Sequence, residues 1–283
     1  PNRVRNTPIS EASITGIATG ASINGYISII EIMFGDFLTL CFDQIINHAT
    51  KFCEMYGKKL NIPLLIRVPM GGKRGYGPTH SQSIEKHFLG IPNLDVIALN
   101  HRVSPLIIYK NLFSNITNPK LVIENKILYT KKLEVLPLAG YEILETDELL
   151  PTIKITPKSN TPSITLFCYG GILEEVEIAV EKIFIEKEIF CEIICPTLID
   201  PINIQPLVES IAKTMKLLIV EEGPNVASLG AELISLIVEG QHMTELNVRR
   251  IGYNGLIPCA INTEKKITPN SHNIVKQINE MFK

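Results

Sequence analysis

Short apolar runs alternate with helical patterns along the first half of the chain. The apolar, often β-branched runs predict buried strands over residues 26–34, 63–68, 95–99 and 121–124. Apolar residues at helical spacing predict helices over residues 10–24, 37–56, 81–89 and 105–113. Because strands that alternate with helices form parallel βαβ units, we expect a parallel sheet with helices on its faces.

The same alternation returns in the second half of the chain. It predicts strands over residues 163–168, 190–194, 216–220 and 247–251, and helices over residues 173–186, 203–215, 227–238 and 271–282. Between the halves the periodicity fades, and prolines and scattered charges predict an inter-domain connection. The expected fold class is α/β, with two parallel-sheet, three-layer domains at residues 1–129 and 163–283, joined by residues 130–162.

Composition narrows the class of protein. The 283 residues are enough for two hydrophobic cores, and 45% of them are hydrophobic. A formal net charge of −2 favours neither nucleic acid nor an anionic membrane as a partner. No apolar run reaches the roughly 20 residues of a transmembrane helix. The six cysteines lack the spacing of a metal site, so we predict no metal. Most of them lie in apolar strand or helix patterns, so we predict reduced thiols and a cytoplasmic location.

The richest candidate site is the glycine-rich stretch that follows the predicted strand at residues 63–68. Four glycines and two prolines lie within residues 69–82, which end in His80-Ser81-Gln82. Such loops bring backbone close to a ligand at the carboxyl ends of strands. A lone histidine is more often structural than catalytic, but this loop favours a functional His80. Lys73 and Arg74 suit a carboxylate or phosphate, although solvated charges on a loop are commonplace.

Two further segments carry candidate chemistry. Glu11 follows Ser10 at a helix start, where serine caps the helix and the carboxylate complements the helix dipole. The alternative is a carboxylate aimed at a ligand, able to hold a proton near neutral pH if buried. Phe34-Gly35-Asp36-Phe37 lies between a strand and a helix, and its ordinary interpretation is two core aromatics and a cap. The sequence contains no P-loop, no dinucleotide fingerprint and no Gly-Asp-Gly.

Taken in order, these segments resemble the beta subunit of thiamine-diphosphate-dependent 2-oxoacid dehydrogenases. The similarity covers nearly the whole chain and is carried by residues 7–11, 16–21, 31–34, 42–47, 67–69, 80–82, 90–96, 118–119, 123–126 and 220–223. The resemblance implies a transketolase-type pyrimidine-binding domain followed by a transketolase C-terminal domain. It also implies a first helix and strand before Thr7, which the pyrimidine-binding domain at residues 1–129 is expected to lack.

The resemblance implies roles for five residues. The glutamate matching Glu11 hydrogen-bonds a pyrimidine nitrogen of thiamine diphosphate, and the aromatic residue matching Phe37 packs on the pyrimidine ring. The histidine matching His80 faces the reacting centre and assists proton transfer or substrate positioning. Ile9 and Met33 match apolar positions near the cofactor. Glu11 and His80 are therefore the expected catalytic residues.

The resemblance also implies partners. In this family an alpha subunit binds the diphosphate through Mg²⁺ with a Gly-Asp-Gly segment, and two alpha chains assemble with two beta chains. The expected partners are that alpha subunit, a second copy of this chain and a lipoyl-bearing acyltransferase that takes the acyl group after oxidative decarboxylation. Pyruvate, branched-chain 2-oxoacids and acetoin all suit the scaffold. The alternatives are a non-catalytic paralogue acting as a scaffold, and a portion of a self-contained transketolase-like enzyme.

Overall fold

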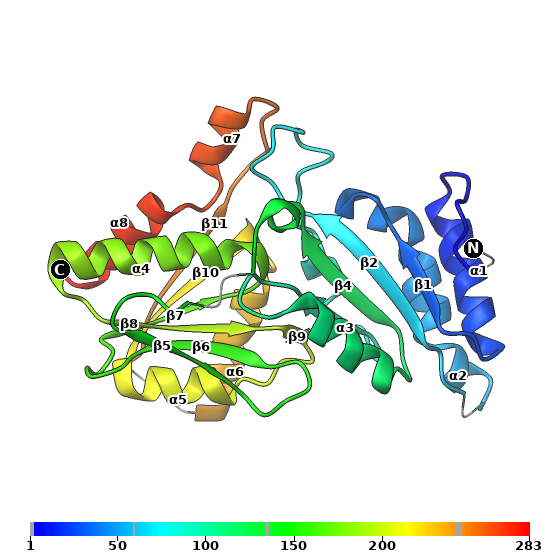
Figure 1. Ribbon diagram of the computed structural model, residues 1–283, viewed down its shortest axis with the longest axis horizontal. Helices are drawn as coiled ribbons and strands as arrows, with labels where there is room; N and C mark the ends of the chain where they lie inside the picture. The colour runs from blue at the N-terminus through cyan, green and yellow to red at the C-terminus, as the bar shows by residue number, and fades with distance from the viewer. Residues whose placement is uncertain (1–2, 59, 134–135, 242–244) are drawn as a thin grey trace.

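The computed structural model describes residues 3–58, 60–133, 136–241 and 245–283, and Figure 1 shows two sheets side by side. The first sheet has the order β1-β2-β4-β3-β9. Its strands are β1 (Ser28–Glu31), β2 (Leu64–Met70), β3 (Asp95–Ala98), β4 (Lys120–Asn125) and β9 (Leu198–Asp200). The first four strands run parallel, whereas β9 comes from the second half of the chain and pairs antiparallel with β3.

The second sheet has the order β11-β10-β7-β8-β6-β5. Its strands are β5 (Tyr141–Glu145), β6 (Thr152–Pro157), β7 (Ile164–Cys168), β8 (Cys191–Pro196), β10 (Lys216–Pro224) and β11 (Asn247–Tyr253). Strands β11, β10, β7 and β8 are parallel, as the alternating pattern predicts. Strands β6 and β5 extend the sheet antiparallel.

The stretch expected to be only a connection therefore contains two strands, which corrects the sequence prediction. Its prolines concealed them, because proline is normally excluded from sheet interiors. In the structure Pro151 precedes β6 and Pro157 is the last residue of that strand, where a missing N–H is tolerated. The three-residue β9 was also not predicted, since it is too short to show a period. Both sheets are thus mixed at one edge.

The helices mostly follow the predicted periodicity. They are α1 (Glu11–Ile23), α2 (Phe52–Met55), α3 (Pro105–Ser114), α4 (Leu173–Lys187), α5 (Gln205–Thr214), α6 (Leu229–Gln241), α7 (Ile261–Ile267) and α8 (Ser271–Met281). Among the described residues, the further short helical segments are the 3-10 helices η1 (Gly35–Cys41), η3 (Glu85–Phe88), η4 (Lys126–Thr130) and η5 (Gly170–Ile172), and the π-helix η2 (Gln44–Ala49). Within the described ranges, every helix is too short or too polar to cross a bilayer.

Two helical predictions need correction. Residues 37–56 form η1, η2 and α2 instead of one regular helix. Residues 81–89 form only the single turn η3, because long-range side-chain contacts hold the segment along an irregular path. Gln82 donates to Asp36, and Glu85 accepts from Tyr169. Tertiary contacts here outweigh a local helical pattern.

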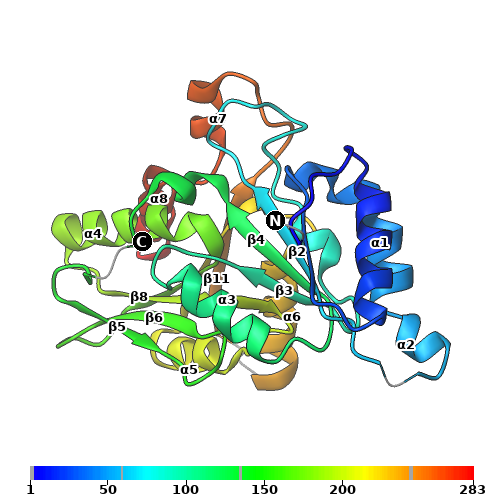
Figure 2. The same ribbon diagram turned by 45° about the vertical axis from the view of Figure 1, so that its right-hand side comes forward.

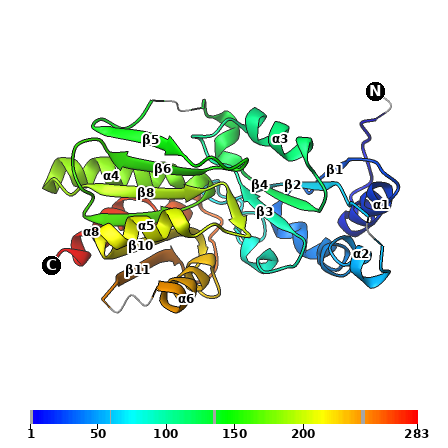
Figure 3. The same cartoon turned by 90° about the horizontal axis from the view of Figure 1, so that it is seen from below.

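Two hydrophobic clusters fill the space above and below the sheets. In the first cluster, α1 and η1 cover one face of the first sheet, while α5 and α6 cover one face of the second. In the other cluster, α3 covers the opposite face of the first sheet, while α4 and α8 cover that of the second (Figure 3). Each sheet is therefore the middle of three layers, and each cluster contains residues from both halves. The halves pack as one body.

We predict that Gly252 is essential to the pairing of β10 with β11. A Cβ at this position would lie 2.5 Å from the backbone oxygen of Gly223, which cannot move away as a side chain could. Gly252→Ala should lower the free energy of unfolding by about 1–3 kcal/mol in urea titrations. The control is Gly240→Ala in α6, where a Cβ meets nothing within 4 Å and should be neutral or stabilising. Equal stability of the two variants would contradict this prediction.

Candidate functional site

The carboxyl ends of β1, β2 and β4 meet at one edge of the first sheet, because these neighbouring strands are parallel. Phe34 lies shortly after β1, the glycine-rich loop at residues 71–80 follows β2, and Lys126 follows β4. Figure 2 shows the loop rising from β2 to lie beside α7. Three segments distant in sequence therefore converge where ligands bind in α/β sheets.

Aromatic rings gather at this edge. The ring of His80 packs edge-on against Phe34 and Phe37, with centroids 4.9 and 5.3 Å apart. Phe34 also contacts Phe37 and Tyr76, at 6.1 and 6.2 Å. A hydrogen bond of 2.9 Å joins His80 Nδ1 and Thr79 Oγ1. The structure thus brings together two of the residues singled out in the sequence, Phe37 and His80.

Two cations border the ring cluster. Lys126 Nζ lies 3.2 Å from the centroid of Phe34, and the Arg74 guanidinium lies 4.5 Å from that of Tyr76. Burial, and after it the charge of Arg74, lowers the pKa of Lys126. Lys126 was not among the site residues expected from the sequence. The feature that could have indicated Lys126 as a site residue is its position directly after β4, a buried strand that is parallel to β2.

Asp36 has a different role from the helix cap considered above. No side chain caps the start of η1, and Asp36 Oδ1 instead accepts a 2.7 Å hydrogen bond from Gln82 Nε2. Asp36 is buried, at 8% exposed, and Gln82 is half-buried. This bond connects the segment after β1 to the segment after His80, so it fixes the spacing of the two segments that carry the rings.

Glu11 begins α1, which packs against η1, the turn that carries Phe37. Its side chain is half-buried, and in the part of the chain that the structure describes no hydrogen bond or ion pair holds its carboxylate. Ser10 makes no capping hydrogen bond to α1 and donates instead to Ser13. Ser10 therefore does not cap the helix, whereas Glu11 lies in the first turn of α1, where its charge complements the helix dipole. No hydrogen bond joins Glu11 to the ring cluster among these residues.

Ile9 and Met33 lie on the surface, 77% and 49% exposed. Met33 directly precedes Phe34 of the ring cluster, and large apolar side chains this exposed favour a covering ligand or partner. An aminopyrimidine has apolar ring faces and polar ring nitrogens. The ring cluster suits the faces, and the Glu11 carboxylate, which has no partner among the described residues, suits the nitrogens. Among the described residues, no group of three or more metal-binding side chains is arranged to hold a metal ion.

Carboxyl groups are buried beneath the site, between the two halves. Glu85 is 3% exposed, and its Oε1 accepts a 2.8 Å hydrogen bond from the hydroxyl of Tyr169. Burial raises the pKa of Glu85 to about 7, because its charged form loses hydration. Burial also raises the pKa values of Glu221 and Glu222. The sequence did not single out this cluster, because Glu85 and Tyr169 lie far along the chain from the adjacent pair Glu221 and Glu222.

The fold and this edge define a transketolase-type protein. The family model of the transketolase pyrimidine-binding domain matches residues 1–132, and that of the transketolase C-terminal domain matches residues 154–274. A solved structure titled "Split gene transketolase, inactive beta4 tetramer" has the same fold, with a TM-score of 0.73 and 18% identity over 99% of this chain and 84% of that one.

Curated relatives show to which family of transketolase-type proteins the chain belongs. The chain is 28% identical to the pyruvate dehydrogenase E1 component subunit beta of Rickettsia felis, over 99% of this chain and 84% of the relative. It is 30% identical to the mitochondrial pyruvate dehydrogenase E1 component subunit beta-1 of Arabidopsis thaliana, over 98% of this chain and 75% of the relative. The chain belongs to the family of pyruvate dehydrogenase E1 beta subunits, which confirms the resemblance found in the sequence.

The raised pKa of Glu85 predicts how stability depends on pH. The folded protein binds this proton more tightly than the unfolded chain, so its contribution to stability falls as pH rises from about 4.5 to about 7. Glu85→Gln mimics the protonated acid. It should raise the free energy of unfolding at pH 8, by up to about 3 kcal/mol, and have little effect near pH 4.5.

Urea titrations at the two pH values measure this difference. Glu280→Gln, on the exposed face of α8, controls for the loss of one negative charge. An equal effect of Glu85→Gln at both pH values would show that the Glu85 carboxyl does not resist ionisation in the folded protein.

Proposed function

We propose that this chain is the beta component of a thiamine-diphosphate-dependent 2-oxoacid dehydrogenase and holds the cofactor's aminopyrimidine at the edge formed by β1, β2 and β4. The observation that carries the proposal is the contact between Phe37 and His80 where these strands end, in a chain of the pyruvate dehydrogenase E1 beta family. Bound thiamine diphosphate supplies the electron sink for decarboxylation. The residues of this chain bind and orient the cofactor and the substrate, and they move protons.

In this proposal Glu11 contacts a pyrimidine nitrogen and shares a proton with it. Its carboxylate is half-buried and has no partner among the described residues, so it is available to a ligand.

The neighbouring thiol of Cys41 is not a nucleophile that would react with the substrate. Burial, and in part the charge of Glu11, raises the pKa of Cys41 to about 11, which keeps the thiol protonated.

Phe37 offers an apolar ring face to the pyrimidine, and its edge-on contact with His80 orients the imidazole. His80 then exchanges a proton with the substrate or positions it, with Nδ1 held by Thr79. Ile9 and Met33 are covered when the cofactor and the partner chain are in place. These roles rest on the family resemblance, supported by the contact of Phe37 with His80 at the end of the strands.

The diphosphate and its Mg²⁺ are held by an alpha subunit that carries Gly-Asp-Gly, because this sequence has no such segment. A second copy of this chain completes the assembly, and a lipoyl-bearing acyltransferase receives the acyl group. A cytoplasmic location is supported by six cysteines that are free in the structure, as a reducing compartment requires. The Arabidopsis relative is named as mitochondrial. Pyruvate is the first 2-oxo acid to test, because the curated relatives are named for it.

We predict that Glu11→Gln in the complex with the alpha subunit lowers cofactor-dependent decarboxylation by about 100-fold or more, because the amide cannot share the proton. The measurement is CO₂ release from pyruvate with saturating thiamine diphosphate and Mg²⁺. Glu232→Gln is a matched control, since Glu232 is an exposed acid in the first turn of α6. It removes a carboxylate of the same kind from a helix start distant from the site.

Calorimetric titration of thiamine diphosphate with Mg²⁺ separates the alternatives. The proposal expects tight binding only when both chains are present, and weaker binding by the Glu11→Gln complex. Full activity of the Glu11→Gln complex would refute the role of Glu11. A complex that assembles but neither binds the cofactor nor decarboxylates would favour the non-catalytic scaffold.

A further inference from the structure

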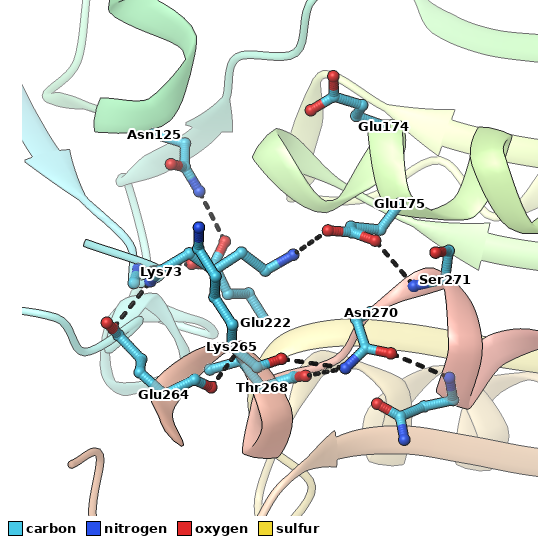
Figure 4. A network of polar contacts seen from close by, with 12 residues as sticks. Lys73, Asn125, Glu174, Glu175, Glu222, Glu264, Lys265, Thr268, Asn270 and Ser271 are labelled. Atoms are coloured by element: carbon cyan, nitrogen blue, oxygen red, sulfur yellow. Dashed lines mark hydrogen bonds and ion pairs between the residues drawn. The ribbon is translucent and has the colours of Figure 1, made fainter. Parts of the chain in front are cut away.

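The glycine-rich loop that carries His80 is held by a carboxylate from the other half of the chain. Glu264, on α7, accepts hydrogen bonds from the backbone N–H of Lys73 at 2.8 Å and of Gly75 at 2.5 Å, one with each carboxylate oxygen. The side chain is 0% exposed, so water does not compete for these bonds. Figure 4 shows Glu264 reaching from α7 to the loop.

A second carboxylate holds the start of the same loop. Glu222, in β10, accepts from the backbone N–H of Gly72 through Oε1 and from Asn125 Nδ2 through Oε2, both at 2.6 Å. Asn125 is the last residue of β4. Glu222 therefore ties the loop after β2 to the end of β4, directly before Lys126.

The loop has the shape that these contacts require. Lys73 adopts φ +66°, a left-handed conformation that costs energy for any residue with a Cβ. This turn directs the N–H groups of residues 73 and 75 to one carboxylate. The Lys73 side chain runs the other way, where its Nζ pairs with Glu175 at 2.8 Å. Strained residues of this kind persist where their surroundings hold them firmly.

The loop also rests directly on the segment before Glu264. A Cβ on Gly75 would lie 3.2 Å from Ile261 Cβ, and one on Gly77 would lie 2.7 Å from Cys259 Sγ. The N–H of His80 in turn donates to the carbonyl of Gly77 at 3.4 Å. The path from Glu264 to the imidazole is thus a short stretch of closely packed backbone.

We propose that Glu264 and Glu222 are positioning residues for His80, placing it against Phe34 and Phe37 by satisfying the amides of its loop. The inference rests on the proposed function of His80 and deepens it. The C-terminal half, which supplies none of the residues expected at the cofactor, thereby controls the geometry of the reaction. Two carboxylates that only joined the halves would have no need to converge on three amides of one loop.

The test is Glu264→Gln in the complex with the alpha subunit, with Glu222→Gln as a second variant. Glutamine keeps the size of the side chain but offers an N–H₂ group to one loop amide in place of an acceptor. We expect kcat for pyruvate to fall about tenfold or more, with a smaller change in KM. We also expect the pH profile of kcat to shift, since it reports the ionisation of the essential acid and base in the bound complex.

Hydrogen exchange in the isolated chain is an independent readout that needs no cofactor. Backbone amides of residues 72–80 should exchange about tenfold faster or more in Glu264→Gln than in the wild type. The matched control is Glu221→Gln. Glu221 is buried beside Glu222, but among the described residues it accepts from Tyr169, Ser228 and Gly230 within its own half and makes no hydrogen bond to the loop. Its loop exchange and kcat pH profile should match the wild type.

His80→Ala distinguishes failure of this inference from failure of the proposed function. If His80→Ala is inactive while both glutamine variants keep wild-type kcat and pH profile, the positioning role is overturned and the proposed function stands. Unchanged loop exchange in Glu264→Gln also overturns the positioning role. If His80→Ala is fully active, the catalytic role of His80 fails, and the inference fails with it. Faster loop exchange together with a lowered kcat and a shifted pH profile supports it.

Discussion

The site depends on how the backbone amides of one loop are satisfied. A glycine-rich loop has no ladder of its own, and buried N–H groups without acceptors are costly. Here the acceptors are the carboxylates of Glu264 and Glu222, brought from the second half of the chain. Charged acceptors make stronger bonds than neutral ones, so they hold a strained conformation at Lys73 that an isolated loop would not keep. The position of His80 follows from this anchoring.

The same arrangement explains why so many carboxyl groups are buried between the halves. Burial raises the pKa values of Glu85, Glu221 and Glu222, so their ionisation opposes folding. A structure selected only for stability would replace such groups with apolar ones. Glu221 and Glu222 instead accept hydrogen bonds from backbone amides, in their own half and in the loop respectively. The buried carboxyl groups lower the free energy of unfolding, but their hydrogen bonds define the geometry where the halves meet.

Much of the fold followed from local pattern. Parallel strands such as β2 and β4 were evident as apolar runs, because a strand buried on both faces needs apolar residues throughout. Strands β5 and β6 were missed because prolines flank or end β6, and because most positions of the edge strand β5 are exposed or half-buried, which obscures any period. The segment from Phe37 to Tyr56 was predicted as one regular helix but forms three short helical segments, because tertiary packing outweighs the local pattern. Within the site, the structure brings Phe37 into contact with His80 and adds Lys126, which the sequence did not indicate.

By itself, the sequence determined the family, the alternation of strands and helices, and the glycine-rich loop with its histidine, because each is written in neighbouring residues. The tertiary structure alone decided which groups hold that loop and which surround the ring cluster. The reason is physical. Periodicity reports the face that an element buries, but a hydrogen bond between a backbone amide and a carboxylate almost two hundred residues away leaves no local pattern. Only the folded chain brings Glu264 to Lys73 and Gly75.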